Sequence, residues 1–409
     1  MTYGDSEPTI SAAKRALDIE YAIRDVVVPA MELEKQGHEI IKLNIGDPLE
    51  YEGLPTPEHM NEAYRQALTE QRNGYSPSYG IPELRSAIAE EETSKGWVCM
   101  EDDVYVCTGV TEALQILFAA SLEAGEKVLA PGPHYPPYMT YPPLFGAKTV
   151  EYRLDPDDNW NPDFDDIASK MDDSVKLLVI INPNNPTGGI ASKEMLEKMI
   201  ELTEQWPQCT IVADEIYDAL NFDGDHHSCA AVASRMSSRV PIITLNGVSK
   251  NFFAPGWRIG YLAIYDPSGR FVQVRDGIER LLRARLCAST PAQYGYLAGL
   301  RGDRSWLQGY RDKVLQRRDY CLERIAEIDG IESATPGGAF YLFPRLTHAA
   351  VEDDKRFVLD LLHQEKVLLV HGSGFSPTLG KGFVRIVYLA NLEILKEAFD
   401  RIERFLRNL

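Results

Sequence analysis

Short apolar runs alternate with helical patterns between about residues 100 and 265. The runs begin at residue 104 (VYVC), 127 (KVLA), 148 (KTVEY), 176 (KLLVII), 210 (TIVA) and 241 (PIITL). Several are apolar throughout, as expected of parallel strands that helices cover on both faces. Helical periodicity lies between them over 111–123 and over 192–205, where Ser192 is a candidate N-cap. The pattern predicts an α/β fold with a buried sheet.

The C-terminal part has a different pattern. Residues 303–327 are strongly amphipathic, and the chain ends on the helical stretch NLEILKEAFDRIERFL. Between about 330 and 390, the segments ESATPGGAFYLFP and KVLLVHG predict shorter strands. The first 45 residues contain one predicted helix. Because no linker separates the parts, we expect a large α/β domain over 48–295 and a smaller α+β domain formed by 1–47 together with 296–409.

Composition narrows the possible partners and location. The 42 Lys and Arg residues face 61 Asp and Glu residues, and the formal net charge of −19 repels nucleic acid and anionic membranes. Six scattered cysteines without a C-x-x-C motif indicate a reducing, cytoplasmic location. No apolar run reaches the roughly 18 residues that cross a bilayer, and the N-terminus lacks the pattern of a signal peptide. We therefore expect no nucleic-acid or membrane partner.

A lysine and an arginine stand together in LNGVSKNFFAPGWRIG, residues 245–260, as Lys250 and Arg258. The lysine follows a predicted strand, where its amine can be partly desolvated and can attack a carbonyl group. Taken alone, such a lysine is also typical of a solvated loop.

Two further predicted strands end in polar residues. The segment NPNNPTG, residues 182–188, follows KLLVII, so Asn185 lies at a carboxyl strand end, where α/β proteins bind ligands. The segment IVADEIY ends a strand with Asp214 and places Tyr217 three residues later. A simple turn and a helix cap are the structural alternatives for these two segments.

A strand, a glycine turn and a helix start are predicted in YVCTGVTEAL, residues 105–114. The backbone N–H groups of Val110 and Thr111 would then point at an anion. Many strand-to-helix joins look the same, and Arg258 is what favours a phosphate here.

Together these motifs resemble the class I aminotransferases, the fold-type I family that uses pyridoxal 5′-phosphate (PLP). The resemblance rests on the joint occurrence of S-K-x(7)-R, N-N-P-T-G and D-E-I-Y, and the matching motifs run from Gly46 to Arg385. It implies an α/β fold with a mainly parallel seven-stranded sheet in the large domain and a smaller α+β domain.

The resemblance also implies roles for the residues around the PLP ring. Lys250 would bind PLP covalently and later move the proton of the substrate α-carbon. Asp214 would pair with the protonated ring nitrogen. Asn185 and Tyr217 would hydrogen-bond the phenolate oxygen, and Tyr135 would stack on the ring.

The phosphate would bind to the amides of Val110 and Thr111, the Thr111 hydroxyl, Ser249 and Arg258. Tyr75 matches a tyrosine that reaches the phosphate of the neighbouring subunit, which implies a homodimer with shared active sites. Gly247 departs from the pattern, because some family members carry a phosphate-binding serine there.

The substrate would contact residues from both predicted domains. Arg385 resembles the arginine that binds the α-carboxylate, for which a planar guanidinium is well suited. The backbone of Gly46 would face the substrate, and Asn185 would contact it as well.

Within the family, the chain resembles the alanine aminotransferases most, on stretches such as Arg285–Gln293 and Lys366–Val370. Tyr21 and Arg24 stand at i and i+3 on one face of a predicted helix. In that subgroup such a pair faces the active site, which would let it meet the distal carboxylate of 2-oxoglutarate. An exposed arginine beside a packing tyrosine is the alternative.

These observations predict an aminotransferase that moves an amino group, best assigned to L-alanine, to 2-oxoglutarate. Aspartate or aromatic amino acid aminotransferases are alternatives, as is a PLP-dependent carbon–sulfur β-lyase, because the same cofactor supports elimination. A non-catalytic regulator would need a basic DNA-binding extension, and only about 45 residues precede the Gly46 motif.

Overall fold

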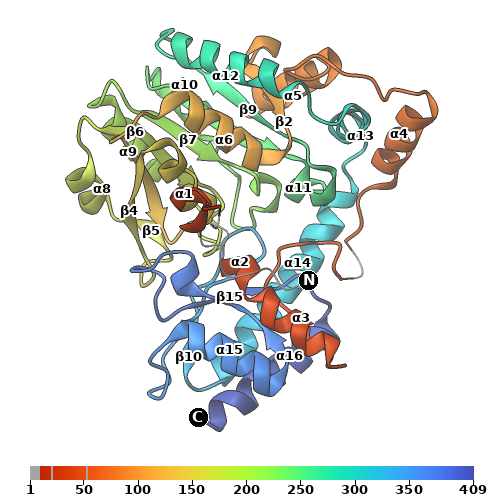
Figure 1. Cartoon of the computed structure of the whole chain (residues 1–409), viewed down its shortest axis with the longest axis vertical. Coiled ribbons are helices and arrows are strands. Elements are labelled where there is room, and N and C mark those ends of the chain that lie inside the picture. Colours follow the sequence, from red (N-terminus) through yellow and green to blue (C-terminus); the bar gives the residue numbers. More distant parts are fainter. Residues whose placement is uncertain (1–9, 20–21, 52–53) are drawn as a thin grey trace.

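The large part of the molecule is built on an eight-stranded sheet (Figure 1). The computed structural model describes residues 10–19, 22–51 and 54–409. In the order β2-β9-β8-β7-β6-β3-β4-β5, the strands are β2 (Val104–Cys107), β9 (Gly260–Tyr265), β8 (Ile242–Gly247), β7 (Thr210–Asp214), β6 (Val175–Ile181), β3 (Lys127–Gly132), β4 (Lys148–Asp155) and β5 (Asn161–Pro162). Adjacent strands from β8 to β4 are parallel, and β9 is antiparallel to both β2 and β8.

The predicted α/β fold is confirmed, with one strand more than the seven expected. All six apolar runs form strands, and β9 is the seventh. The eighth, β5, has two residues and forms an antiparallel pair with the end of β4. An element this short carries no hydrophobic period, so the sequence pattern does not reveal it.

Helices cover the sheet on both faces, as β6 shows. Leu177, Val179 and Ile181 pack in one core with α6 (Gly109–Ser121) and α12 (Val272–Arg285). The alternate residues Leu178 and Ile180 pack in the other core with α9 (Lys193–Glu204) and α10 (Cys229–Met236). Successive side chains of a strand point to opposite faces, so a strand buried on both sides is apolar throughout.

The predicted helices are present with small shifts of their ends. The Ser192 side chain accepts a hydrogen bond from the Met195 N–H at 3.3 Å, which confirms the predicted cap of α9. The other helices of the large part are short or lie at its edge: α4 (Glu58–Thr69), α5 (Pro82–Ser94), α7 (Pro137–Thr140), α8 (Phe164–Lys170), α11 (Val248–Asn251) and α13 (Thr290–Arg301).

The second part combines small sheets with long helices. Its strand pairs are β1 with β13, β10 with β12, and the three-stranded β11-β15-β14. These strands are β1 (Ile41–Lys42), β10 (Ile331–Glu332), β11 (Tyr341–Leu342), β12 (Arg345–Leu346), β13 (Val367–Leu368), β14 (Val370–His371) and β15 (Val384–Val387). Its helices are α14 (Trp306–Glu327), α15 (Asp354–Glu365) and α16 (Leu392–Arg407).

Residues 22–42 of the N-terminal segment join this second part, whereas residues 14–17 contact residues 142–145 of the large part (Figure 1). The strand β1 pairs in parallel with β13, and α2 (Ala22–Asp25) lies beside the C-terminal elements (Figure 1). The described part of the first 45 residues holds three helices instead of the one expected: α1 (Lys14–Leu17), α2 and α3 (Val27–Lys35). The sequence pattern does not reveal α1 and α2, because helices of four residues are too short to show a period.

The domain boundaries stay a prediction. The helix α13 crosses residue 295 without a break and packs against α4 and α5. This packing favours a boundary slightly later in the chain than the one expected.

Within the described ranges, no helix has the length and apolar character needed to span a membrane.

Candidate functional site

Three neighbouring strands deliver the predicted motifs to one edge of the sheet. Ile181 and Leu245 are both paired with Asp214 across the strand β7, so β6, β7 and β8 end side by side. The loop with Asn185 leaves β6, and the short helix with Lys250 follows β8. Carboxyl ends of parallel strands are where open α/β sheets bind ligands.

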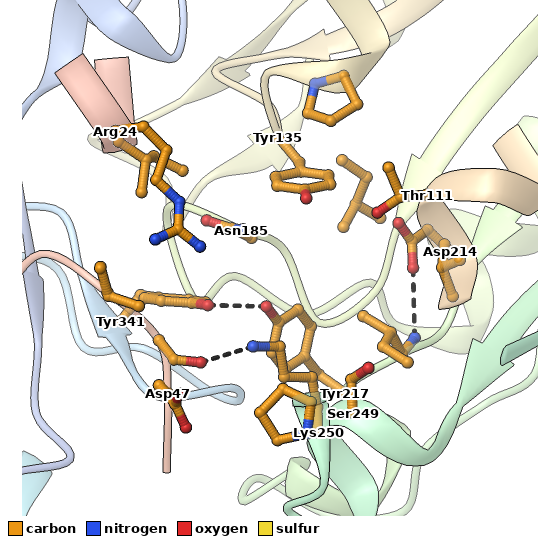
Figure 2. Close-up of a pocket in the computed structure, with 18 of the residues that line it drawn as sticks. Arg24, Asp47, Thr111, Tyr135, Asn185, Asp214, Tyr217, Ser249, Lys250 and Tyr341 are labelled. Carbon is orange, nitrogen blue, oxygen red and sulfur yellow. Dashed lines mark hydrogen bonds between the residues drawn. The ribbon is translucent and has the colours of Figure 1, made fainter. Parts of the chain in front are cut away.

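A cavity of about 620 Å³ opens at this edge (Figure 2). Twelve of the fourteen candidate residues line it: Arg24, Gly46, Val110, Thr111, Tyr135, Asn185, Asp214, Tyr217, Ser249, Lys250, Arg258 and Arg385. The residues come from both parts of the molecule, so the cavity lies between them.

Lys250 points into the cavity from α11. Its Nζ donates a hydrogen bond to the Gly46 carbonyl at 2.6 Å. Burial lowers the pKa of Lys250 to about 8, with Asp47 opposing the shift and the arginines that share the cavity adding to it. At pH 7 about a tenth of this amine is therefore unprotonated, far more than for an ordinary lysine, and can act as a nucleophile or a base.

Asp214 ends β7 as a buried carboxylate. The Tyr138 hydroxyl donates to its Oδ2 at 2.8 Å, and the Ile216 N–H donates to its Oδ1 at 3.4 Å. Burial raises the pKa of Asp214 to about 6, although the Tyr138 hydrogen bond lowers it. Both donors are neutral, so a cationic group of a ligand in the cavity would compensate the charge of this carboxylate.

An anion-binding corner lies where α6 begins. The first N–H groups of a helix have no intrahelical acceptor, and Val110 and Thr111 stand in the first turn. Gly109 has a positive φ of 75°, and a Cβ there would lie 2.5 Å from an Arg258 guanidinium nitrogen. A Cβ on Gly260 would lie 2.7 Å from the Val110 nitrogen. The two glycines thus let the helix start, β9 and Arg258 approach one another closely.

Arg385 projects from β15 between two aromatic rings. Its Cζ lies 4.6 Å from the ring centre of Tyr341 and 4.7 Å from that of Phe375. One Nη donates to the Asn185 side-chain oxygen at 2.9 Å, and the other donates to the Asn44 carbonyl. The fixed guanidinium is suited to bind a carboxylate in the cavity.

Three candidates at the periphery have different outcomes. Arg24 extends from α2 toward the cavity (Figure 2). Tyr21 lies outside the described residues. Tyr75 is 85% exposed and does not line the cavity of its own chain. It could therefore contact a bound phosphate only in the cavity of another subunit.

The tyrosines of the site that were not predicted include Tyr138 and Tyr341. Tyr138 holds Asp214 by the hydrogen bond described above. Tyr341 comes from β11, and its hydroxyl lies 2.8 Å from that of Tyr217. Tyr138 stands three residues after Tyr135 in the segment PGPHYPPY, so the cluster of aromatic residues was the available signal. Tyr341 reaches the site only through the packing of the two parts, and no local pattern indicates it.

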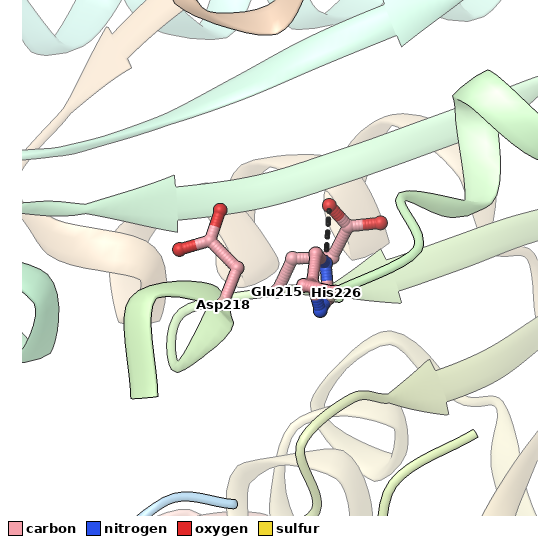
Figure 3. Close-up of side chains that lie close together, drawn as sticks. All are labelled: Glu215, Asp218 and His226. Atoms are coloured by element: carbon pink, nitrogen blue, oxygen red, sulfur yellow. Dashed lines mark ion pairs between the residues drawn. The ribbon is translucent and has the colours of Figure 1, made fainter. Parts of the chain in front are cut away.

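A second cluster of titratable groups, Glu215, Asp218 and His226, lies outside the cavity (Figure 3). Their ligand atoms lie within 4.8 Å of one another. The Lys95 ammonium lies 2.7 Å from an Asp218 oxygen and 2.7 Å from a Glu92 oxygen, and His226 lies 3.4 Å from Glu215. Because lysine already supplies a positive charge to these carboxylates, we assign the cluster to a buried ion-pair network and place no metal there.

The donor set of the cavity suits a phosphorylated carbonyl compound. The helix start and Arg258 can bind a phosphate, the Lys250 amine can attack a carbonyl carbon, and Asp214 can pair with a cationic nitrogen.

Comparisons with known proteins agree with this geometry. The family model described as aminotransferase class I and II matches residues 38–402. The glutamate-pyruvate aminotransferase AlaA of Haemophilus influenzae is 38% identical over 95% of this chain and 96% of its own length. The alanine aminotransferase of Mycobacterium bovis is 38% identical over 95% of this chain and 91% of its own. The structure of an alanine aminotransferase from Pyrococcus furiosus superposes with a TM-score of 0.94 at 47% identity, covering 98% of this chain and all of that one. The chain therefore belongs to the class I and II aminotransferases.

Proposed function

We propose that this aminotransferase uses PLP to move the amino group of L-alanine to 2-oxoglutarate. The observation that carries the proposal is the pair formed by Lys250, with a pKa lowered to about 8, and Asp214, a buried carboxylate with only neutral donors, facing one cavity. The names of the relatives support alanine as the donor.

The side chains of the cavity fit PLP at each of its functional groups. Asp214 would accept a hydrogen bond from the protonated ring nitrogen, which gives the buried carboxylate a cationic partner that the described residues do not supply. Tyr135 would cover the ring face. The phosphate would bind at the start of α6 with Thr111, Ser249 and Arg258.

The chain's own residues would carry out proton transfer and orientation. When bound, PLP supplies an aldehyde that accepts the amino group and a cationic ring that withdraws electron density from the substrate α-carbon. The Lys250 amine would remove the α-proton, and its lowered pKa raises the fraction that is unprotonated and able to do so. Arg385 and Asn185 would fix the α-carboxylate so that this proton points at Nζ. Release of the first 2-oxo acid before the second binds would give ping-pong kinetics.

A half-reaction screen tests the proposal directly. The PLP-loaded enzyme is mixed with single amino acids, and loss of its visible absorption band is followed. L-Alanine and L-glutamate are expected to bleach the band faster than aspartate or aromatic amino acids. Faster bleaching by aspartate would contradict the assignment of alanine. Pyruvate and ammonia formed from a cysteine derivative without any 2-oxo acid would identify a β-lyase instead.

Substitution of Arg24 by alanine is expected to weaken 2-oxoglutarate selectively. A hydrogen bond to a charged group contributes roughly 1.5–3 kcal/mol, so the KM for 2-oxoglutarate should rise about 10- to 100-fold. Alanine and pyruvate lack the distal carboxylate, and their KM values should change less than about threefold. Arg15→Ala, an exposed arginine on α1, is the matched control. Equal losses for both kinds of substrate would remove this role.

We also propose a homodimer with shared sites. The exposure of Tyr75 on its own chain leaves its ring available to the phosphate site of a second copy. A mass in solution equal to the 45.9 kDa of one chain would contradict this.

The six cysteines are all described and unpaired, which supports a reducing, cytoplasmic location. Localisation by fluorescent tagging would test it.

A further inference from the structure

The hydroxyl group of Tyr341 has no role in the proposed function so far. It lies 2.8 Å from the Tyr217 hydroxyl, and the side chains meet edge to face with ring centres 5.7 Å apart (Figure 2). Tyr341 is 2% exposed and lines the cavity. The contact joins a tyrosine that follows β7 to one on β11 of the second part.

The hydrogen bond between the two hydroxyl groups can be donated by either of them, and the direction depends on what else Tyr217 donates to. Burial raises the pKa of both tyrosines, so both keep their protons at working pH. Each hydroxyl has one proton to donate. If Tyr217 donates into the cavity, the hydrogen bond between the pair must be donated by Tyr341.

Packing holds the Tyr341 hydroxyl in place. The Arg385 guanidinium lies against its ring at 4.6 Å, and a Cβ on Gly46 would lie 2.4 Å from its oxygen. The glycine leaves room for this hydroxyl beside the backbone carbonyl that Lys250 contacts. The side chain therefore has little freedom to turn away from Tyr217.

We propose that Tyr341 is a positioning residue that directs the Tyr217 proton into the cavity, toward the phenolate oxygen of PLP. The inference rests on the proposed function. By donating to Tyr217, the Tyr341 hydroxyl polarises the Tyr217 O–H group and strengthens its donation to the phenolate. A phenolate stabilised in this way attracts less strongly the proton on the nitrogen that joins Lys250 to PLP, so the pKa of that nitrogen falls.

The test is a pH titration of the visible absorption band of the PLP-loaded enzyme without substrate. Tyr341→Phe keeps the ring on Arg385 and removes only the hydroxyl. In this variant, the apparent pKa of the nitrogen that joins Lys250 to PLP should rise by about half a unit, the size expected from one hydrogen bond. Tyr217→Phe should raise it further. In the double variant, the Tyr341 substitution should add nothing to the effect of Tyr217→Phe, because Tyr341 acts through Tyr217.

Controls separate this outcome from general damage. Tyr152→Phe removes a buried hydroxyl that donates to the Val179 carbonyl at 2.9 Å, away from the cavity, and its titration should match the wild type. If Tyr341→Phe does not fold, Gly46→Ala is a second variant: its Cβ would lie 2.4 Å from the Tyr341 hydroxyl oxygen and 2.7 Å from a Phe340 ring carbon, so it should displace both side chains and shift the apparent pKa upward.

Distinct results would overturn the two proposals. A wild-type chain that takes up no PLP, or shows no visible band, would contradict the proposed function. An apparent pKa unchanged in Tyr341→Phe would overturn the inference alone. So would an equal shift in the presence and absence of the Tyr217 hydroxyl, because Tyr341 would then act by another route.

Discussion

Turnover is expected to fall by at least about 10⁴-fold when Lys250 is replaced by alanine. The substitution removes both the nucleophile that holds the cofactor and the base that moves the α-proton, and general acid–base catalysis alone contributes about 10²- to 10⁴-fold. Steady-state assays with alanine and 2-oxoglutarate would measure the loss. The start of α6 and Arg258 are untouched, so PLP should still bind through its phosphate.

A control and a chemical label define this result. Lys198 is an exposed lysine on α9, and Lys198→Ala should keep turnover within about twofold, as most surface substitutions do. Borohydride reduction of the wild-type holoenzyme should attach the PLP group permanently to residue 250. Sustained transamination by Lys250→Ala, or a label on another residue, would refute the assigned role.

The largest opposing effects on activity and stability are expected at Asp214. Asp214→Asn removes the anionic partner of the ring nitrogen, and turnover should fall by at least about 10²-fold, the usual cost of losing one electrostatic contact in an active site. The Tyr138 hydroxyl can still donate to the new amide oxygen. The fold should therefore be retained, as a circular dichroism spectrum would show.

The same substitution should stabilise the protein without PLP at alkaline pH. Folding raises the pKa of Asp214 from 3.8 to about 6, so the folded state binds this proton more tightly than the unfolded state. The resulting stabilisation is complete below pH 3.8 and is lost as the pH rises through about 6. At pH 8 the buried carboxylate thus costs up to about 3 kcal/mol. Asp214→Asn should recover about 1–3 kcal/mol there and about half as much at pH 5.

Denaturant unfolding at both pH values measures this difference. Asp158→Asn is the matched control because Asp158 is exposed, and it should change the free energy of unfolding by less than about 0.5 kcal/mol. Added PLP should reverse the order of stability, since only the wild type gains the pair with the ring nitrogen. An Asp214→Asn protein that is no more stable than the wild type at pH 8 would contradict the sign.

The arrangement of the strand ends could be predicted from the sequence. Continuous apolar runs indicate parallel strands buried on both faces, and parallel strands end at a common edge. Asn185, Asp214 and Lys250 follow three such runs, so their convergence needs no knowledge of the tertiary structure. The same holds for the anion site at Val110, because a glycine turn before a helix is a local feature.

The contacts between the two parts could not be predicted in this way. Tyr341 is separated from Tyr217 by 124 positions in the chain, and β11 is too short to show a period. Tyr138 faces Asp214 only because β3 and β7 both flank β6. Such contacts depend on packing across the sheet and between the two parts, which hydrophobic patterns along one segment do not encode.

Asp214 and Glu215 are consecutive residues with separate tasks. One carboxylate faces the cavity, and the other joins the ion pairs with His226 and Lys95 on the opposite side. A slip of a single residue in the pairing of β7 would exchange them. Asp214 would then face the ion-pair network, and the longer Glu215 side chain would face the cavity. An insertion or deletion within this strand should therefore harm catalysis and folding together, whereas one in the loops that precede it would spare both.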